Sequence, residues 1–142
     1  MKNTFDLFEN SKNKSSKHKK YFQIYDEIFK PYIDKKITFV EIGILDGGSL
    51  EIWSNYFGTK ARIIGIDINP ECKKFENKNI EIFIGNQSDQ NFWKKFYEEV
   101  GKVDIVLDDG GHTNKQQIIT TIKSVPNIND GGLLVIEDTH TS

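Results

Sequence analysis

Cysteine, arginine and long apolar runs are nearly absent from this sequence. Cys72 is the only cysteine, so no internal disulfide can form, which fits a reducing compartment. Arg62 is the only arginine, and 19 basic against 21 acidic residues give a net charge of −2, so the chain has no positive field to hold nucleic acid. The N-terminus lacks the apolar core of a signal peptide, and no run approaches the ~18 apolar residues of a membrane span. We therefore expect a cytoplasmic protein that binds neither nucleic acid nor a membrane.

The sequence does contain enough apolar residues for one folded domain. Its 142 residues are 37% hydrophobic and 12% aromatic, which is typical of a chain that buries a core. The first twenty residues are polar and rich in lysine, so we expect a flexible N-terminal segment over residues 1–16 and a single domain over residues 17–142. Apolar residues spaced three and four apart predict an amphipathic helix over residues 18–33.

Short runs of β-branched and apolar residues alternate with helix-like stretches along the rest of the chain. This alternation predicts right-handed βαβ units and a parallel sheet with helices on both faces, which is an α/β, Rossmann-like fold. The predicted strands cover residues 38–42, 61–66, 80–84, 103–107 and 133–136. The predicted helices cover residues 49–57, 91–100 and 114–125, with a short turn after Pro70.

In such a sheet, ligands bind outside the carboxyl ends of the strands. Polar or small residues follow all five predicted strands, in the segments VEIGILDGGSL, GIDINP, IGNQSD, LDDGGH and IEDTH. One such loop is weak evidence, because surface loops are generally polar. Five of them at the same edge indicate a ligand site.

The first two loops favour one class of cofactor. A dinucleotide-binding loop, G-x-G-x-x-G, needs its middle glycine beside the pyrophosphate, and counted from Gly43 that position is Leu45. Glu41 adds a carboxylate, which would repel an anionic cofactor and tolerate a cationic amine or sulfonium. Asp67 ends the second strand, where a carboxylate commonly holds ribose hydroxyls. These residues favour S-adenosylmethionine over NAD; the alternative is that the glycines of GILDGG only form a tight turn.

The fourth loop, VLDDGGH, places two carboxylates and a histidine within five residues: Asp108, Asp109 and His112. Side chains of these types at a ligand edge suit divalent-cation binding and base catalysis. Two alternatives remain open. His112 would cap the helix that begins near Asn114, and Asp108 would be a turn residue that accepts backbone N–H groups.

The order and spacing of five motifs resemble those of class I S-adenosylmethionine-dependent methyltransferases. In particular they resemble the metal-dependent sugar O-methyltransferases of the macrocin and mycinamicin type, with cephalosporin hydroxylase-like proteins as relatives. The motifs are VEIGILDGGSLEIW, IIGIDI, GNQSD, VLDDGGHTNKQQI and GGLLVIEDTHTS. The resemblance implies magnesium-assisted methyl transfer from S-adenosylmethionine to a hydroxyl of a sugar, glycan or glycosylated natural product.

The resemblance also implies roles for individual residues. His112 would act as general base, and Asp109, Glu137 and Asp138 would ligate Mg²⁺. Three carboxylates at neighbouring strand ends would repel one another, and a hard divalent ion would relieve that repulsion. The loop from Glu41 to Gly47 and Asp67 would hold the methionine and ribose parts of the cofactor, and Gln87 and Ser88 would lie near the adenine. The implied cofactor-binding residues are Glu41, Gly43, Gly47, Ser49, Asp67, Gln87, Ser88 and Asp108.

The sequence departs from the family pattern in two places. Asn86 stands where the family usually has an aspartate, which changes the contact near the adenine. The sequence ends at Ser142, where class I methyltransferases normally continue, so we expect a fold truncated after strand five, with that open edge covered by a second copy or another partner. The alternative function is a truncated or degenerate domain that binds S-adenosylmethionine or a partner without turnover. A nucleotide-binding oxidoreductase is disfavoured by Leu45.

Overall fold

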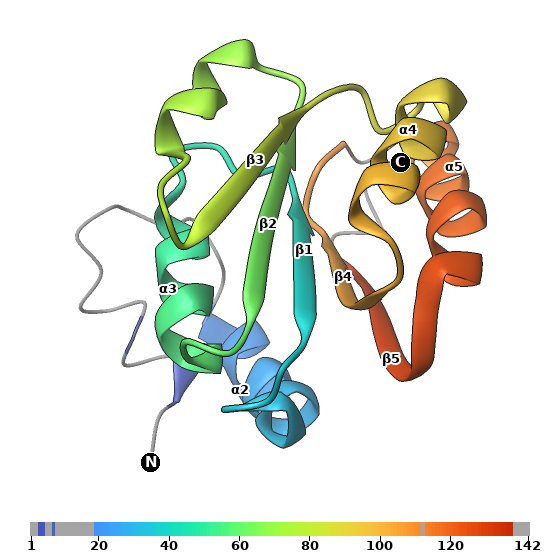
Figure 1. Cartoon of the computed structure of the whole chain (residues 1–142). Coiled ribbons are helices and arrows are strands. Elements are labelled where there is room, and N and C mark those ends of the chain that lie inside the picture. Colours follow the sequence, from blue (N-terminus) through green and yellow to red (C-terminus); the bar gives the residue numbers. More distant parts are fainter. Residues whose placement is uncertain (1–2, 5–6, 8–18, 112, 138–142) are drawn as a thin grey trace.

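The computed structural model describes residues 3–4, 7, 19–111 and 113–137 (Figure 1). Five strands form one sheet in the order β3-β2-β1-β4-β5, and neighbouring strands are parallel. The strands are β1 (Thr38–Ile42), β2 (Arg62–Asp67), β3 (Ile80–Ile84), β4 (Val103–Asp108) and β5 (Ile128–Ile136). The helices are α2 (Lys19–Phe29), α3 (Gly48–Phe57), α4 (Gln90–Val100) and α5 (Asn114–Ser124), with the 3₁₀ helices η1 (Lys30–Tyr32), η2 (Pro70–Phe75) and η3 (Val125–Asn127). The predicted Rossmann-like fold is confirmed.

Local capping fixes the ends of the helices near the carboxyl edge. The side chain of Asp89 accepts a backbone N–H at the start of α4, which ends at Gly101 with φ +81°. Thr113 caps α5 in a reciprocal capping box with Gln116. Thr113 therefore holds the N-cap position that the sequence left open for His112, which itself lies outside the described residues.

Two elements differ from the sequence prediction in extent. The helix expected over residues 18–33 ends as an α-helix at Phe29, because Pro31 lies in the 3₁₀ turn that follows. Strand β5 begins at Ile128, whereas the sequence predicts a strand only from residue 133 onward, so the strand is five residues longer at its start than expected. The residues before Leu133 include a Gly-Gly pair, and the register of β4 against β5 shifts between Val103 and Ile105.

The two faces of the sheet carry separate apolar cores. Helices α2 and α3 cover one face and α4 and α5 the other (Figure 1). Trp53 of α3 stacks among the aromatic residues of the first core, and Trp93 of α4 lies in the second. Both indole side chains are buried completely, so both tryptophans belong to the core.

Thr4 and Leu7 of the N-terminal segment contact the rest of the domain. Thr4 is buried, where its backbone N–H donates to Asp26 Oδ1 at 2.8 Å and its hydroxyl to the carbonyl of Phe22 at 2.9 Å. Leu7 packs against the first core. The flexibility predicted for residues 1–16 stays a prediction, because most of that segment lies outside the described residues. None of the described helices has the length and apolarity needed to cross a membrane.

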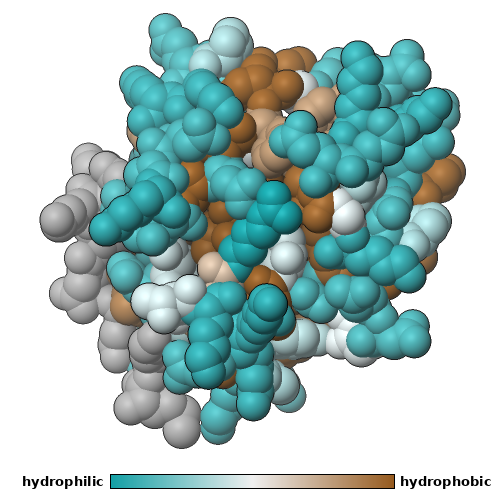
Figure 2. Space-filling model, viewed as in Figure 1, coloured by the Kyte–Doolittle hydropathy of each residue, from teal (hydrophilic) through white to brown (hydrophobic). Residues whose placement is uncertain are grey.

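Exposed apolar side chains gather on the side of the molecule formed by α5 and β5. Ile118 and Ile122 of α5 and Val125 of η3 are each more than half exposed, one to two turns apart. Figure 2 shows apolar surface at the right-hand border, where α5 lies. Next to it, β5 occupies one end of the strand order. A row of exposed apolar residues beside an edge strand is a surface that favours association.

Candidate functional site

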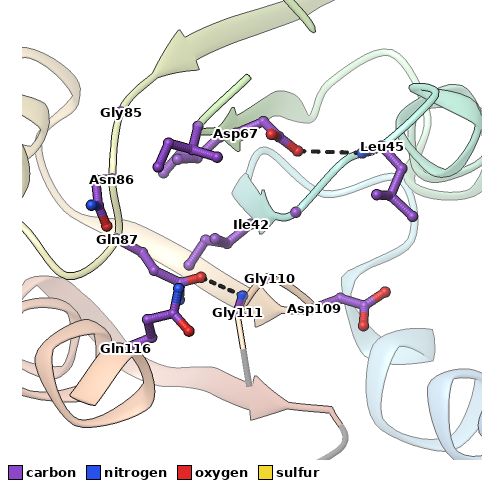
Figure 3. A pocket seen from close by; sticks show the side chains of 13 residues that line it. Ile42, Leu45, Asp67, Gly85, Asn86, Gln87, Asp109, Gly110, Gly111 and Gln116 are labelled. Carbon is purple, nitrogen blue, oxygen red and sulfur yellow. Dashed lines mark hydrogen bonds between the residues drawn. The ribbon is translucent and has the colours of Figure 1, made fainter. Parts of the chain in front are cut away.

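A cavity of about 250 Å³ opens at the carboxyl edge of the sheet, where the loops after β1, β2, β3 and β4 converge. This is the edge at which the sequence predicts a ligand site. Figure 3 shows Asp67 at one end of the cavity, the amides of Gln87 and Gln116 on one side, and Leu45 and Asp109 on the other. The lining residues are Ile42, Gly43, Leu45, Ile66, Asp67, Ile68, Gly85, Asn86, Gln87, Asp109, Gly110, Gly111 and Gln116.

Gly43 brings the first and fourth loops into contact. Its φ is +83°, and a Cβ there would lie 2.4 Å from the carbonyl oxygen of Asp109 and 2.6 Å from Cα of Gly110. No other residue type satisfies both the left-handed backbone and this close approach. The glycine therefore positions the loop that carries the predicted metal ligand.

Asp67 organises the first loop. Its Oδ2 accepts the backbone N–H of Ile44 at 3.0 Å and that of Leu45 at 3.4 Å, while Oδ1 accepts the N–H of Asn69 at 3.0 Å. Figure 3 shows the bond to Leu45. The carboxylate is only half-buried, and Oδ1, which accepts one of these N–H groups, keeps a lone pair for a ligand hydroxyl. A ribose diol in the cavity would share this carboxylate with the loop.

Glu41 and Ser49 lie behind the first loop and do not line the cavity. Both are buried, and the Ser49 hydroxyl donates to Glu41 Oε1 at 2.6 Å, which ties α3 to the end of β1. Gly47 precedes α3 with φ +77°, and a Cβ on it would lie 2.6 Å from the ring of Phe75. These three predicted cofactor residues therefore support the shape of the loop.

The fourth loop is held from inside the protein. Asp108 is buried, and its Oδ1 accepts the backbone N–H of Gly110 at 3.0 Å, which confirms the turn role left open for it. The amide Nε2 of Gln87 donates to both Asp108 oxygens, at 3.2 and 3.1 Å. Gln87 Oε1 in turn accepts the N–H of Gly111 at 2.7 Å (Figure 3).

Asn86 and Ser88 form the wall next to Gln87. Asn86 lines the cavity, and its Oδ1 accepts both the backbone N–H and the hydroxyl of Ser88, at 2.9 and 2.8 Å. Ser88 itself lies outside the lining. Where an aspartate would present a charge, Asn86 presents a neutral amide.

Asp109 and Glu137 follow adjacent parallel strands. Asp108 pairs with Ile136, and the N–H of Glu137 donates to the carbonyl of Asp108 at 2.9 Å, so the two carboxylate residues start from neighbouring positions at one edge. Glu137 is buried with only 5% of its surface exposed. Asp109 and Glu137 are thus carboxylate residues at adjacent strand ends, and carboxylate oxygens are ligands that a hard divalent cation prefers.

Two predicted active-site residues, His112 and Asp138, lie outside the described residues. Within residues 19–111 and 113–137, no group of three histidine, cysteine or carboxylate side chains is assembled for a metal. The flanks of His112 are described: Gly111 lines the cavity and Thr113 caps α5.

The charged side chains that line the cavity are both carboxylates, Asp67 and Asp109. Such a wall disfavours a pyrophosphate and suits a neutral or cationic ligand. Cys72 lies just behind it, and its thiol donates to the carbonyl of Leu45 at 3.5 Å. Burial raises the pKa of this thiol, and the charge of Asp67 raises it further, so Cys72 is a neutral packing residue.

Sequence reasoning therefore identified Gly43, Asp67, Gln87 and Asp109 among the lining residues. It missed Ile68 and Gln116. Ile68 is 65% exposed, and its position directly after the strand-ending aspartate was the available signal. Gln116 is the fourth residue of T-N-K-Q, a capping-box pattern that fixes its side chain near the start of α5.

The chain resembles sugar O-methyltransferases in sequence, although no family model matches it. It is 33% identical over 129 residues to 8-demethyl-8-alpha-L-rhamnosyl tetracenomycin-C 2'-O-methyltransferase from Streptomyces olivaceus, covering 86% of this chain and 34% of the relative. It is 33% identical over 125 residues to mycinamicin VI 2''-O-methyltransferase from Micromonospora griseorubida, covering 83% and 31%. The chain thus spans about a third of the length of the curated relatives it matches.

A solved structure shows the same likeness. The chain superposes with a TM-score of 0.86 on the MycE methyltransferase from the mycinamycin pathway, solved with Mg, SAH and mycinamycin VI. The two are 28% identical, and the match covers 96% of this chain and 37% of MycE. By sequence and fold, the chain belongs to the class I S-adenosylmethionine-dependent methyltransferases. Within that class it is homologous to the sugar O-methyltransferases of the macrocin, mycinamicin and tetracenomycin type.

Proposed function

We propose that this chain is the cofactor- and magnesium-binding part of an O-methyltransferase that methylates a hydroxyl of a sugar, glycan or glycosylated natural product. The observation that carries the proposal is the carboxyl-edge cavity, which is lined by Asp67 at the end of β2 and by Asp109 directly after β4. Its relatives are named for methylation of sugar hydroxyls, and MycE is solved with Mg and SAH.

The cofactor would lie along the ends of β1, β2 and β3. Asp67 would accept the ribose hydroxyls while continuing to hold the first loop. Asn86 would offer its amide to the adenine, and Ile68 would supply apolar surface next to it. The carboxylate-lined wall would tolerate the sulfonium of S-adenosylmethionine, whereas an anionic cofactor would be repelled.

Asp109 and Glu137, together with Asp138, would hold the magnesium ion on the other side of the cavity. When bound, Mg²⁺ would lower the pKa of an acceptor hydroxyl. His112, between Gly111 and Thr113, would take the proton from that hydroxyl as its oxygen forms a bond to the methyl carbon. The carbon–sulfur bond breaks in the same step, and its electron pair leaves with S-adenosylhomocysteine.

The surface formed by β5, Ile118, Ile122 and Val125 would be covered in the working protein by further polypeptide or by a second copy. We also infer that the protein works in the cytoplasm and that its substrate is a small molecule or glycan. The single domain over residues 17–142 would then supply the cofactor and metal residues, while the acceptor contacts come partly from elsewhere.

Calorimetric titration of the 142-residue chain with S-adenosylmethionine, with and without Mg²⁺, tests the proposal. We expect saturable cofactor binding and a separate magnesium signal. Replacing both Asp109 and Glu137 by alanine should remove the magnesium signal and leave cofactor binding in place. A folded chain that binds neither ligand would refute the function. Binding of both without methylation of any sugar acceptor would favour a domain that binds the cofactor without turnover.

A further inference from the structure

Gln87 lines the cavity, yet its amide is already engaged by the protein. Nε2 lies 3.1 and 3.2 Å from the two oxygens of Asp108 and 2.9 Å from the hydroxyl of Thr120, and Oε1 accepts the N–H of Gly111. A carboxylate can only accept and a backbone N–H can only donate, so these partners fix the orientation of the amide. Both N–H groups are used within the protein. A ligand that took a hydrogen bond from Gln87 would have to break one of these bonds.

The main chain of Gln87 is anchored as firmly as its side chain. Its carbonyl accepts the indole N–H of the fully buried Trp93 at 2.8 Å, and the Gln87 side chain is itself only 6% exposed. The fourth loop rests directly on this amide, because a Cβ at Gly110 would lie 2.3 Å from Gln87 Oε1. Gln87 is therefore a rigid support on which the loop backbone sits.

That loop sets the place of the carboxylates. The N–H of Asp109 donates to the carbonyl of Ile42 at 2.9 Å, and the N–H of Glu137 donates to the carbonyl of Asp108 at 2.9 Å. These two bonds fix the start of the loop, while the Gln87 amide fixes its continuation at Gly110 and Gly111. Without the amide, the peptide after Asp109 would lose its support, and buried Asp108 would lose a donor.

We propose that Gln87 is a positioning residue whose buried amide holds the Asp108–Gly111 loop and thereby sets the placement of the Asp109 and Glu137 carboxylates for a divalent cation. The proposal rests on the proposed magnesium site. It replaces adenine recognition as the role of Gln87. Partners that orient metal ligands from outside the first coordination sphere typically change metal affinity about 10–100-fold when removed.

The test compares Gln87→Met with a matched control, Ser124→Ala. Methionine has a similar length and shape but cannot form the hydrogen bonds. Ser124 is also buried on α5, where its side chain accepts the Tyr97 hydroxyl at 2.8 Å far along the helix from the loop. Three quantities are measured on the whole chain: Mg²⁺ affinity with SAH present, SAH affinity without Mg²⁺, and hydrogen exchange of the Gly110 and Gly111 amides.

We expect Gln87→Met to weaken Mg²⁺ binding about tenfold or more, to speed exchange at both glycines, and to change SAH affinity less than about threefold. Ser124→Ala should lower stability without moving any of the three quantities. If Gln87→Met does not fold, Thr120→Val keeps the shape of its side chain and removes one acceptor of the amide, so a smaller loss of Mg²⁺ affinity in the same direction is expected.

Unchanged Mg²⁺ affinity in Gln87→Met would overturn the proposal. So would a selective loss of SAH affinity, which would assign Gln87 to adenine recognition. Failure of the wild-type chain to bind Mg²⁺ would instead overturn the proposed function, and with it the role of Gln87. The two cases are distinguishable, because the proposal for Gln87 is tested by comparing the variant with a wild-type chain that binds Mg²⁺, whereas the proposed function is tested on the wild-type chain alone.

Discussion

The first and fourth loops face the same cavity but are held in opposite ways. The Gly43–Gly47 loop is held from its open side by the half-buried carboxylate of Asp67. The Asp108–Gly111 loop is held from the protein interior by the buried amide of Gln87. A ligand hydroxyl can compete for Asp67, whereas a ligand that bonded to the amide of Gln87 would have to break one of its bonds within the protein. The first loop is therefore open to a ligand at Asp67, whereas the fourth loop is supported from within, next to the carboxylates proposed to bind a metal ion.

Gly43, where the two loops touch, offers the strongest way to break this arrangement. Gly43→Ala places a Cβ 2.4 Å from the carbonyl oxygen of Asp109 at φ +83°. We expect a loss of about 2–5 kcal/mol in the free energy of unfolding from backbone strain and overlap together. Urea denaturation measures it. Gly101→Ala is the control, because φ is +81° there too but a Cβ would meet no atom within 4 Å, so backbone strain alone should cost about 1–3 kcal/mol. Equal losses would contradict the close contact.

Alkaline pH should weaken the helices behind both loops. Tyr56 of α3 and Tyr97 of α4 are buried, and desolvation of each phenol raises its pKa from 10.0 to about 12. Both ionise more readily when unfolded, so stability is retained below about pH 10 and lost as pH rises through about 12. Each should contribute about 2–3 kcal/mol to the loss.

Urea denaturation across this pH window measures the alkaline effect. The Tyr97→Phe variant should lose less stability than the wild type between about pH 9 and about pH 12, although removing the bond to Ser124 lowers its stability at neutral pH. A pH dependence identical to that of the wild type would show that Tyr97 does not titrate across the unfolding transition.

Asp67→Asn tests whether the first loop and the cofactor share one side chain. Asparagine keeps an oxygen for the N–H of Ile44 but loses the charge, so we expect S-adenosylmethionine affinity to fall more than about tenfold with a loss of stability near 1 kcal/mol. Calorimetry measures the first and urea denaturation the second. Asp104→Asn is the control, because Asp104 also accepts a backbone N–H, from Thr38 at 2.8 Å, but at the amino end of the sheet. Equal cofactor affinity in both variants would refute the ribose assignment.

The smallest expected effect concerns Leu45. Its φ is +49°, a left-handed conformation that strains a leucine, and its side chain is 69% exposed. Leu45→Asn should therefore stabilise the chain by about 0.5–1 kcal/mol, because asparagine tolerates this conformation. Ile68→Asn is the control: this side chain is similarly exposed in the same cavity, without a positive φ. A gain in both variants would mean that polarity, not backbone strain, is responsible.

Patterns within a few residues predicted most of the fold. Alternating strands and helices gave the Rossmann-like order, and strand-ending residues located the ligand edge with Gly43, Asp67 and Asp109 on it. The irregular start of β5 was missed, because Asn, Asp and Gly residues conceal a strand that tertiary pairing with β4 forms. Glu41 and Ser49 were expected at the cofactor, but they bond to each other behind the loop.

The sequence by itself determined the class of fold, the edge of the sheet at which the cavity opens and the types of side chain placed there, since periodicity, caps and strand ends act over short distances along the chain. Only the tertiary structure decided which way those side chains turn. The amide of Gln87 meets partners 21, 24 and 33 residues away, at Asp108, Gly111 and Thr120. No local pattern specifies contacts of that separation, because they exist only after the strands have paired and the helices have packed on the sheet.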